Sequence, residues 1–151
     1  VFQNPVLFSG SIRDNLLMGN PEATDEDLLY CVRAAGCEQF IGMLPGGFDF
    51  PLTERGRELS VGMRQSLAVA RALIAKPNML LLDEPTAPLD AGTEKTLVDS
   101  LDEATKGMTV ICVTHHGAML QLVDRLIIIE GGKVAMDGPR DKILKKINAQ
   151  A

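Results

Sequence analysis

Two adjacent carboxylates follow an apolar run near the middle of this 151-residue chain. Residues 79–82 are continuously apolar, and Asp83 and Glu84 come directly after them. Such a run predicts a strand buried on both faces, which would present the acids at the carboxyl edge of a sheet, where ligands bind in α/β proteins. Successive strand residues point to opposite faces, so the two acids would serve different tasks. In phosphoryl transfer, one acid can hold Mg²⁺ while another orients or deprotonates a water; a solvated acidic turn is the alternative.

A second candidate site lies at the start of the longest helical pattern, over residues 61–76. Ser60 precedes this pattern as the predicted N-cap, and Gly62 leaves its backbone N–H exposed. The positive end of a helix dipole beside such groups favours an anion. An ordinary capped helix explains the same residues, so both interpretations stand when this segment is considered alone.

Five motifs occur in a fixed order along the chain. They are Gln3, residues 59–65 (LSVGMRQ), residues 79–84 (MLLLDE), residues 87–90 (APLD) and His115. Together they strongly resemble the ATPase domain of ABC proteins, in which the corresponding motifs are the Q-loop glutamine, the LSGGQRQ signature, Walker B, the D-loop and the switch histidine. Each motif is weak by itself, so the resemblance depends on their order over nearly the whole chain.

The resemblance implies roles at the nucleotide for several residues. Glu84 would act as the general base, and His115 would contact the γ-phosphate and stabilise the transition state. Asp83 would bind Mg²⁺ through water, and Gln3 would touch Mg²⁺ or the attacking water. The implied cofactors are therefore ATP and Mg²⁺. His116 has no counterpart in the family, and we expect it on the surface.

Other matching residues would act across a dimer interface. Ser60 and Gly62 would reach the γ-phosphate bound by the opposite subunit, and Asp90 would also work across that interface. The resemblance thus implies a second ATPase domain, arranged head to tail, as a partner.

Three residues depart from the family motifs. Val61 replaces a glycine of the signature, Met63 replaces a glutamine, and Pro88 lies within the D-loop. A β-branched residue does not readily take a positive φ, whereas Pro88 stiffens its turn and removes one backbone donor. We interpret the two signature changes as a tolerated variant, because Ser60 and Gly62 are kept. The intact Glu84 argues against a wholly degenerate site.

Two further segments resemble exporters within the family. Residues 7–15 (LFSGSIRDN) are similar to the segment after the Q-loop, and residues 54–56 (ERG) to the loop before the signature. Both lie against the membrane domain in exporters, so the resemblance implies a transmembrane partner and a place at the cytoplasmic face of a membrane. Residues 138–144 (GPRDKIL) resemble the type I secretion group, which implies the bacterial inner membrane. Solvated charged loops are the alternative for residues 7–15 and 54–56.

Composition and charge exclude other kinds of protein. The chain is 46% hydrophobic and 23% charged, as in ordinary globular proteins. A net charge of −5 and a pI near 5.0 argue against a nucleic-acid partner. No apolar run approaches the roughly 18 residues that a transmembrane helix needs. Cys31, Cys37 and Cys112 lack CxxC spacing, so we expect free thiols.

Helical patterns dominate up to Pro77, and strands alternate with helices after it. The predicted helices cover residues 24–35, 61–76, 90–105, 118–123 and a last stretch from residue 139. Residues 1–3 are predicted as the end of a strand, and residues 78–83 and 109–114 as two buried strands. The predicted strands at 125–129 and 133–136 form a hairpin through the Gly131-Gly132 turn. This order predicts an α/β fold: part of a mainly parallel sheet of the P-loop NTPase type, with the helical subdomain of ABC ATPases. We expect one partial domain over residues 1–151, with the helical subdomain over about 11–76 and the α/β part over about 77–151.

No GxxxxGK[ST] phosphate loop occurs in the sequence. The family places this loop and the adenine-stacking aromatic before the Q-loop glutamine, so we expect a truncated fragment that binds Mg·ATP very weakly and does not hydrolyse it. The family also places the strand that leads into the loop between the strands at 109–114 and 125–129. We therefore expect an oligomer, a swapped dimer, or a sheet in which these two strands close the gap.

The leading hypothesis is the ATPase component of an ABC exporter, which couples ATP binding and hydrolysis to transport. One alternative is a soluble ABC ATPase of DNA repair, chromosome or ribosome function; the acidic pI and the exporter-like residues 7–15 and 54–56 weigh against it. Another alternative is a non-catalytic interaction fragment, which the missing phosphate loop supports. The intact Glu84 and His115 indicate, however, that the parent protein was catalytic.

Overall fold

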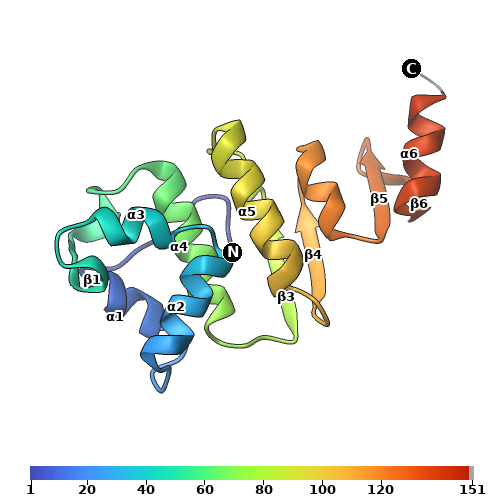
Figure 1. Ribbon diagram of the computed structural model, residues 1–151. Coiled ribbons are helices and arrows are strands. Elements are labelled where there is room, and N and C mark those ends of the chain that lie inside the picture. Colours follow the sequence, from blue (N-terminus) through green and yellow to red (C-terminus); the bar gives the residue numbers. More distant parts are fainter. Residues whose placement is uncertain (150–151) are drawn as a thin grey trace.

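Helices fill the first half of the chain and most strands lie in the second half, as the computed structural model shows for residues 1–149 (Figure 1). The α/β class predicted from the sequence is confirmed. The helices are α1 (Ile12–Leu17), α2 (Asp25–Ala34), α3 (Glu38–Met43), α4 (Val61–Leu73), α5 (Ala91–Ala104) and α6 (Arg140–Asn148), with 3₁₀ turns at Gly47–Asp49, Glu54–Gly56 and Gly117–Leu122. The strands are β1 (Gly10–Ser11), β2 (Pro51–Leu52), β3 (Met79–Asp83), β4 (Thr109–Val113), β5 (Arg125–Glu130) and β6 (Lys133–Pro139).

Side-chain caps set the starts of the principal helices. Thr24 caps α2 in a capping box with Asp27, and the Ser60 hydroxyl accepts a hydrogen bond from the Met63 N–H at 3.1 Å at the start of α4. After α4 the chain leaves the helical conformation at Lys76, where φ is 48°. The predicted starts at Thr24 and Ser60 are therefore confirmed.

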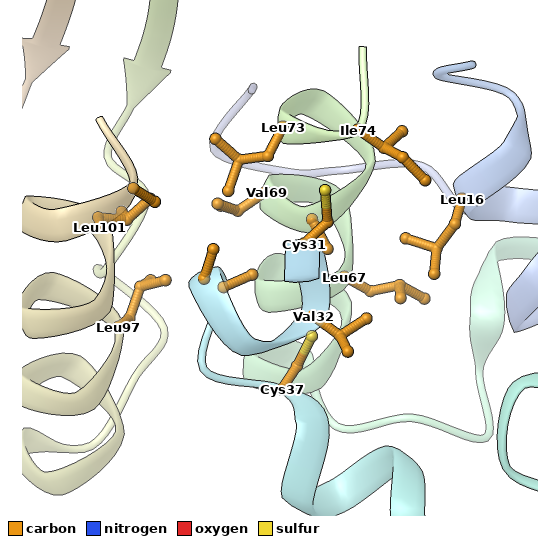
Figure 2. Close-up of a cluster of buried hydrophobic side chains, with 14 of the residues drawn as sticks. Leu16, Cys31, Val32, Cys37, Leu67, Val69, Leu73, Ile74, Leu97 and Leu101 are labelled. Carbon is orange, nitrogen blue, oxygen red and sulfur yellow. The ribbon is translucent and has the colours of Figure 1, made fainter. Parts of the chain in front are cut away.

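The hydrophobic core extends from α1 through α4 and α2 to α5 (Figure 2). Leu67 of α4, Leu16 of α1 and Leu28 of α2 are completely buried, and Leu97 and Leu101 of α5 are buried beside them. A fully buried leucine contributes roughly 1.5–3 kcal/mol, so this core holds α4 and α5 firmly in place. The starts of these two helices carry three of the predicted site residues.

The three cysteines are free thiols, as predicted. Burial raises the pKa of Cys31 and of Cys112 to about 11. Burial also raises the pKa of Cys37, whose side chain is completely enclosed. All three thiols are therefore protonated and unreactive at neutral pH.

β3 and β4 pair in parallel, with Leu81 opposite Ile111 and Asp83 opposite Val113. The prediction that these strands are buried on both faces is wrong. Leu80 and Leu82 join the helical core, whereas Leu81 and Ile111 are 55% and 48% exposed. The reason is that, within residues 1–149, no element covers the face that carries the exposed side chains.

The first residue of the chain lies alongside β3. The Val1 carbonyl accepts a hydrogen bond from the Asp83 N–H at 3.0 Å, and the Val1 amino group donates to the Leu81 carbonyl at 2.6 Å. Residues 1–3, predicted as a strand end, are not a regular strand, but these two contacts place their start at the edge of β3.

β5 and β6 form the predicted antiparallel hairpin, and the Gly131-Gly132 turn joins them. In Figure 1 the hairpin stands apart from β4. The described strands form three separate pairs, β1–β2, β3–β4 and β5–β6. Of the three expected outcomes, the sheet in which residues 109–114 and 125–129 close the gap is therefore wrong, and the oligomer and the swapped dimer stay predictions. The physical reason is that β5 takes its ladder hydrogen bonds from β6 and makes none to β4. Of the helices in residues 1–149, none is long and apolar enough to cross a membrane.

Candidate active site

Glu84 leaves β3 with a left-handed backbone, at φ 46°. Its N–H donates to the Val113 carbonyl at 2.9 Å, which extends the β3–β4 ladder beyond Asp83. A non-glycine residue in this region costs of order 1–3 kcal/mol and persists only where surrounding contacts hold it. The turn brings the Glu84 carboxylate to the residues that follow β4.

The Glu84 carboxylate contacts the two residues that directly follow β4, Thr114 and His115. His115 Nδ1 lies 2.7 Å from Glu84 Oε1, and the Thr114 hydroxyl donates to Oε2 at 3.4 Å. The Glu84 side chain is only 16% exposed, whereas that of His115 is 72% exposed. A base oriented by a hydrogen-bonded neighbour is the geometry that activates a nucleophile. The structure thus brings the two predicted catalytic residues into direct contact.

Asp83 ends β3, and Gln3 lies close to it in the chain segment that begins at the edge of this strand. No hydrogen bond joins the two side chains within residues 1–149. Asp83 is exposed, and its backbone is tied to Val1, two residues before the exposed Gln3. Carboxylate and amide oxygens are the ligand types that Mg²⁺ prefers, so the donor atoms of both side chains fit this ion.

Ser60, Gly62 and Asp90 lie together on the wall of one groove, which measures about 790 Å³. The groove runs between the start of α4 and the start of α5. Phe40 and Leu89 supply apolar parts of the same wall. The predicted site residues therefore form two groups, one at the ends of β3 and β4 and one along this groove.

Gly62 packs closely against the Leu89 side chain. A Cβ atom built on Gly62 would lie 2.9 Å from Leu89 Cδ2. Val61 is the first residue of α4 and its φ is not positive, so the β-branched side chain causes no backbone strain there. The signature variant keeps its helical form.

Asp90 caps α5 with both carboxylate oxygens. One oxygen accepts the N–H groups of Gly92 and Thr93 at 3.0 Å, and the other accepts the Thr93 hydroxyl at 2.6 Å. These hydrogen bonds, that of the Thr93 side chain first, lower the pKa of Asp90 below its ordinary value. Asp90 is therefore ionised at the groove at neutral pH.

His116 and Glu94 were not identified as site residues from the sequence. His116, expected on the surface, is partly buried there: its side chain is 27% exposed, and its Nδ1 lies 3.1 Å from Glu94 Oε1. This is an ion-pair distance and not a well-directed hydrogen bond, since Oε1 has no hydrogen-bond partner of good geometry within residues 1–149. Two signals were present: the second histidine directly follows His115, and Glu94 lies one helical turn after Asp90.

Comparison with known protein families gives a match over the first part of the chain. The model of the ABC transporter family matches residues 1–87, which is more than half of the chain. The chain belongs to the ABC transporter family. The residues of this ABC transporter chain that the family model matches include Gln3, residues 59–65, Asp83 and Glu84.

Curated relatives and a solved structure extend the match to nearly the whole chain. The mitochondrial potassium channel ATP-binding subunit of Mus musculus is 38% identical over 97% of the chain, and multidrug resistance protein homolog 65 of Drosophila melanogaster is 41% identical over 95%. The chain spans only 20% and 11% of the lengths of these relatives. The structure of a bacterial Atm1-family ABC exporter with ATP bound is similar to this chain, with a TM-score of 0.88 and 30% sequence identity. The match covers 97% of this chain and 26% of the exporter chain.

The two exporter-like segments of this ABC transporter chain lie side by side. β1 pairs with β2, and a Cβ on Gly56 would come within 2.8 Å of Leu7 Cδ1. Asn15 is fully buried and closes the first segment by exchanging hydrogen bonds with the backbone of Phe8, at 2.8 and 2.9 Å. A solvated loop, the alternative for these residues, does not describe Asn15 or Gly56.

Proposed function

We propose that this chain is part of the ATP-hydrolysing domain of an ABC exporter, which couples ATP binding and hydrolysis to transport. The observation that carries the proposal is the mostly buried Glu84 carboxylate held 2.7 Å from the exposed imidazole of His115. The exporter named by the structural match and the multidrug resistance relative support the transport role.

Within this site Glu84 acts as the general base. Its carboxylate accepts the proton of the attacking water, while His115 and Thr114 keep it oriented. His115 presents the rest of its ring to solvent, where it can donate to the γ-phosphate and stabilise the developing charge. The turn at Glu84 fixes this arrangement before the nucleotide arrives.

Asp83 and Gln3 supply oxygen donors that would hold Mg²⁺ beside the base. The exposed Asp83 carboxylate at the end of β3 has no ion-pair partner within residues 1–149 and is free to act through water. When bound, Mg²⁺ neutralises charge on the phosphates.

Ser60, Gly62 and Asp90 act on the nucleotide of a second ATPase domain. They share one groove, and Ser60 lies at the positive end of the 13-residue α4. The Ser60 oxygen accepts the Met63 N–H, which leaves its own O–H available to a phosphate oxygen. We infer a head-to-tail dimer in which this groove faces the γ-phosphate bound by the partner.

The exporter function implies a transmembrane domain as the other partner and a place at the cytoplasmic face of the membrane. The joined segments at β1–β2 and Glu54–Gly56 are the surface that we assign to this contact. No nucleic-acid partner is proposed, because the net charge is −5. Membership of the type I secretion group, and with it the bacterial inner membrane, stays a prediction.

We also propose that residues 1–151 form one partial domain, divided near residue 77 into a helical subdomain and part of an α/β core. The sequence contains no GxxxxGK[ST] loop to cradle the β- and γ-phosphates. The chain by itself is therefore expected to be inactive, and the activity belongs to the full-length protein.

Glu84→Gln in the full-length protein tests the proposal. The amide keeps the shape of the side chain but cannot accept the proton, so we expect steady-state ATP turnover to fall by roughly 10²–10⁴-fold while ATP affinity is unchanged. Glu103→Gln, which removes an exposed carboxylate of α5, is the matched control and should turn over normally. Normal turnover in Glu84→Gln contradicts the assignment of the base.

A further inference from the structure

Three side chains that could bind a metal ion lie close together where β3 and β4 end. Each of Glu84, His115 and His116 offers one ligand atom, and these atoms all lie within 4.8 Å of one another. The hydrolytic function proposed above uses Glu84 and His115 but gives His116 no task. We propose that the three side chains form a binding site for a divalent transition-metal ion of the Zn²⁺ type, separate from the Mg²⁺ that accompanies ATP.

The donor set selects the class of ion. Two imidazoles and one carboxylate suit Zn²⁺, Co²⁺ and Ni²⁺, whereas Mg²⁺ requires oxygen donors and near-ideal octahedral geometry. Asp83, the exposed all-oxygen donor beside this cluster, is not one of its three members. The chain thus presents an oxygen site and a nitrogen-rich site next to each other.

Glu94 gives His116 the support that metal-bound histidines usually have. A ligating histidine commonly donates its other ring N–H to a carboxylate, which fixes the ring and its tautomer. Glu94 Oε1 is buried, has no hydrogen-bond partner within residues 1–149, and lies 3.1 Å from His116 Nδ1, so a small rotation of either side chain would complete this hydrogen bond. With Nδ1 beside Glu94, Nε2 of His116 is the nitrogen that we assign to the metal.

Small side-chain movements complete the site. Tetrahedral Zn²⁺ places its ligand atoms about 3.3 Å apart. The His115–Glu84 contact at 2.7 Å must therefore open slightly, and the other pairs, which already lie within 4.8 Å, must adjust to the same spacing. The His115 side chain is 72% exposed and can make this movement, and the two imidazole centroids are already 4.5 Å apart.

Metal binding would engage the two groups that hydrolysis needs. Glu84 could not accept a proton while it ligates the ion, and His115 could not reach a phosphate. This consequence, inhibition of ATP turnover by micromolar-range Zn²⁺, rests on the proposed function; the binding site itself does not.

Co²⁺ absorption tests the site directly in the tag-free full-length protein without nucleotide. We expect the wild type to develop saturable visible d–d bands on titration with Co²⁺, and Zn²⁺ to displace them. His116→Gln should abolish these bands, and Glu94→Gln should weaken Co²⁺ binding about 10–100-fold by removing the support of His116. Glu103→Gln on the same helix and Cys112→Ser, next to the site, are controls that should bind Co²⁺ as the wild type does. Far-UV circular dichroism checks that each variant is folded.

The result that overturns the site is a wild-type protein with no saturable Co²⁺ bands, or a folded His116→Gln variant that keeps them. For each variant, the inhibition is measured as the Zn²⁺ concentration that lowers the rate of ATP hydrolysis to half of the rate without Zn²⁺. We expect that concentration to rise at least tenfold in His116→Gln and in Glu94→Gln. Equal half-inhibitory Zn²⁺ concentrations in all variants contradict the inhibition. If Glu84 proves not to be the base, loss of the Co²⁺ bands in His116→Gln still supports the metal site.

Discussion

At the scale of single residues, the contact between Gly62 and Leu89 ties the start of α4 to the D-loop. A methyl group on Gly62 would meet Leu89 Cδ2 at 2.9 Å, which is closer than packed carbon atoms approach. By contrast, a Cβ on Gly42 of α3 would point into open space. The two helical glycines therefore form a matched pair for testing this contact.

We predict different effects for these two substitutions. Replacing a helical glycine by alanine gains about 0.5–1 kcal/mol in helix propensity, so Gly42→Ala should raise the free energy of unfolding by up to this amount. Gly62→Ala should gain less or lose stability, because the new methyl group displaces the Leu89 side chain. Urea unfolding measures both variants, and an equal gain in Gly62→Ala contradicts the contact.

Part of the site around Glu84 was predicted from the sequence. The acid pair and His115 were recognised through their order along the chain, and the structure puts Glu84 and His115 in contact. The left-handed turn at Glu84 could not be predicted, because glutamate has no intrinsic preference for it and the Val113 carbonyl from a distant strand holds it. The partial burial of His116 also depends on a distant residue, Glu94.

At the scale of elements, an ion pair ties the start of α2 to the end of α4. Lys76 Nζ lies 2.8 Å from Asp27 Oδ1, just beyond the last turn of α4. This contact, together with the hydrogen bonds of Thr24, lowers the pKa of Asp27 to about 2. Folding therefore favours the ionised form of Asp27 over the protonated form.

The low pKa of Asp27 predicts a pH dependence of stability. In the unfolded chain an aspartate has a pKa of about 3.9, so the contribution of Asp27 is fully present above this pH and is lost as the pH falls toward about 2. Urea unfolding between pH 5 and pH 2 should show a smaller decline for Asp27→Asn than for the wild type. Identical slopes for Asp27→Asn and the wild type contradict the prediction.

The elements themselves were largely predictable because their caps and turns are local. Thr24, Ser60, Asp90 and the Gly131-Gly132 turn marked boundaries that the structure confirms. The burial of β3 and β4 was not predictable, because an apolar run does not reveal whether both faces are covered. The short helix α3, residues 38–43, carries no side-chain cap and was not identified.

At the scale of the whole molecule, apolar strand faces remain open on β4 and β5. Ile111 and Val113 of β4 are 48% and 61% exposed, and Ile127 and Ile129 of β5 are 55% and 68% exposed. β4 and β5 also make no ladder to each other. Unpaired edges with apolar side chains recruit other chains, so these faces favour self-association.

We predict that the 151-residue chain by itself forms oligomers through these faces. Sedimentation velocity at several concentrations should show a mass that rises with concentration, and Ile111→Lys combined with Ile129→Lys should reduce it. Tyr30→Lys, which changes an equally exposed side chain on α2, should leave the association unchanged. A wild-type chain that stays monomeric at every concentration contradicts the prediction.

Hydrolysis of bound ATP in a single turnover tests the central role of Glu84 most directly. The full-length Glu84→Gln variant is loaded with Mg·ATP, and the conversion of bound ATP to ADP is followed by rapid quenching. If Glu84 is the base held by His115, ATP remains bound and unhydrolysed, at a rate at least about 100-fold below that of the wild type. Conversion at the wild-type rate would show that another group takes the proton of the attacking water, and the account of this site would then be wrong.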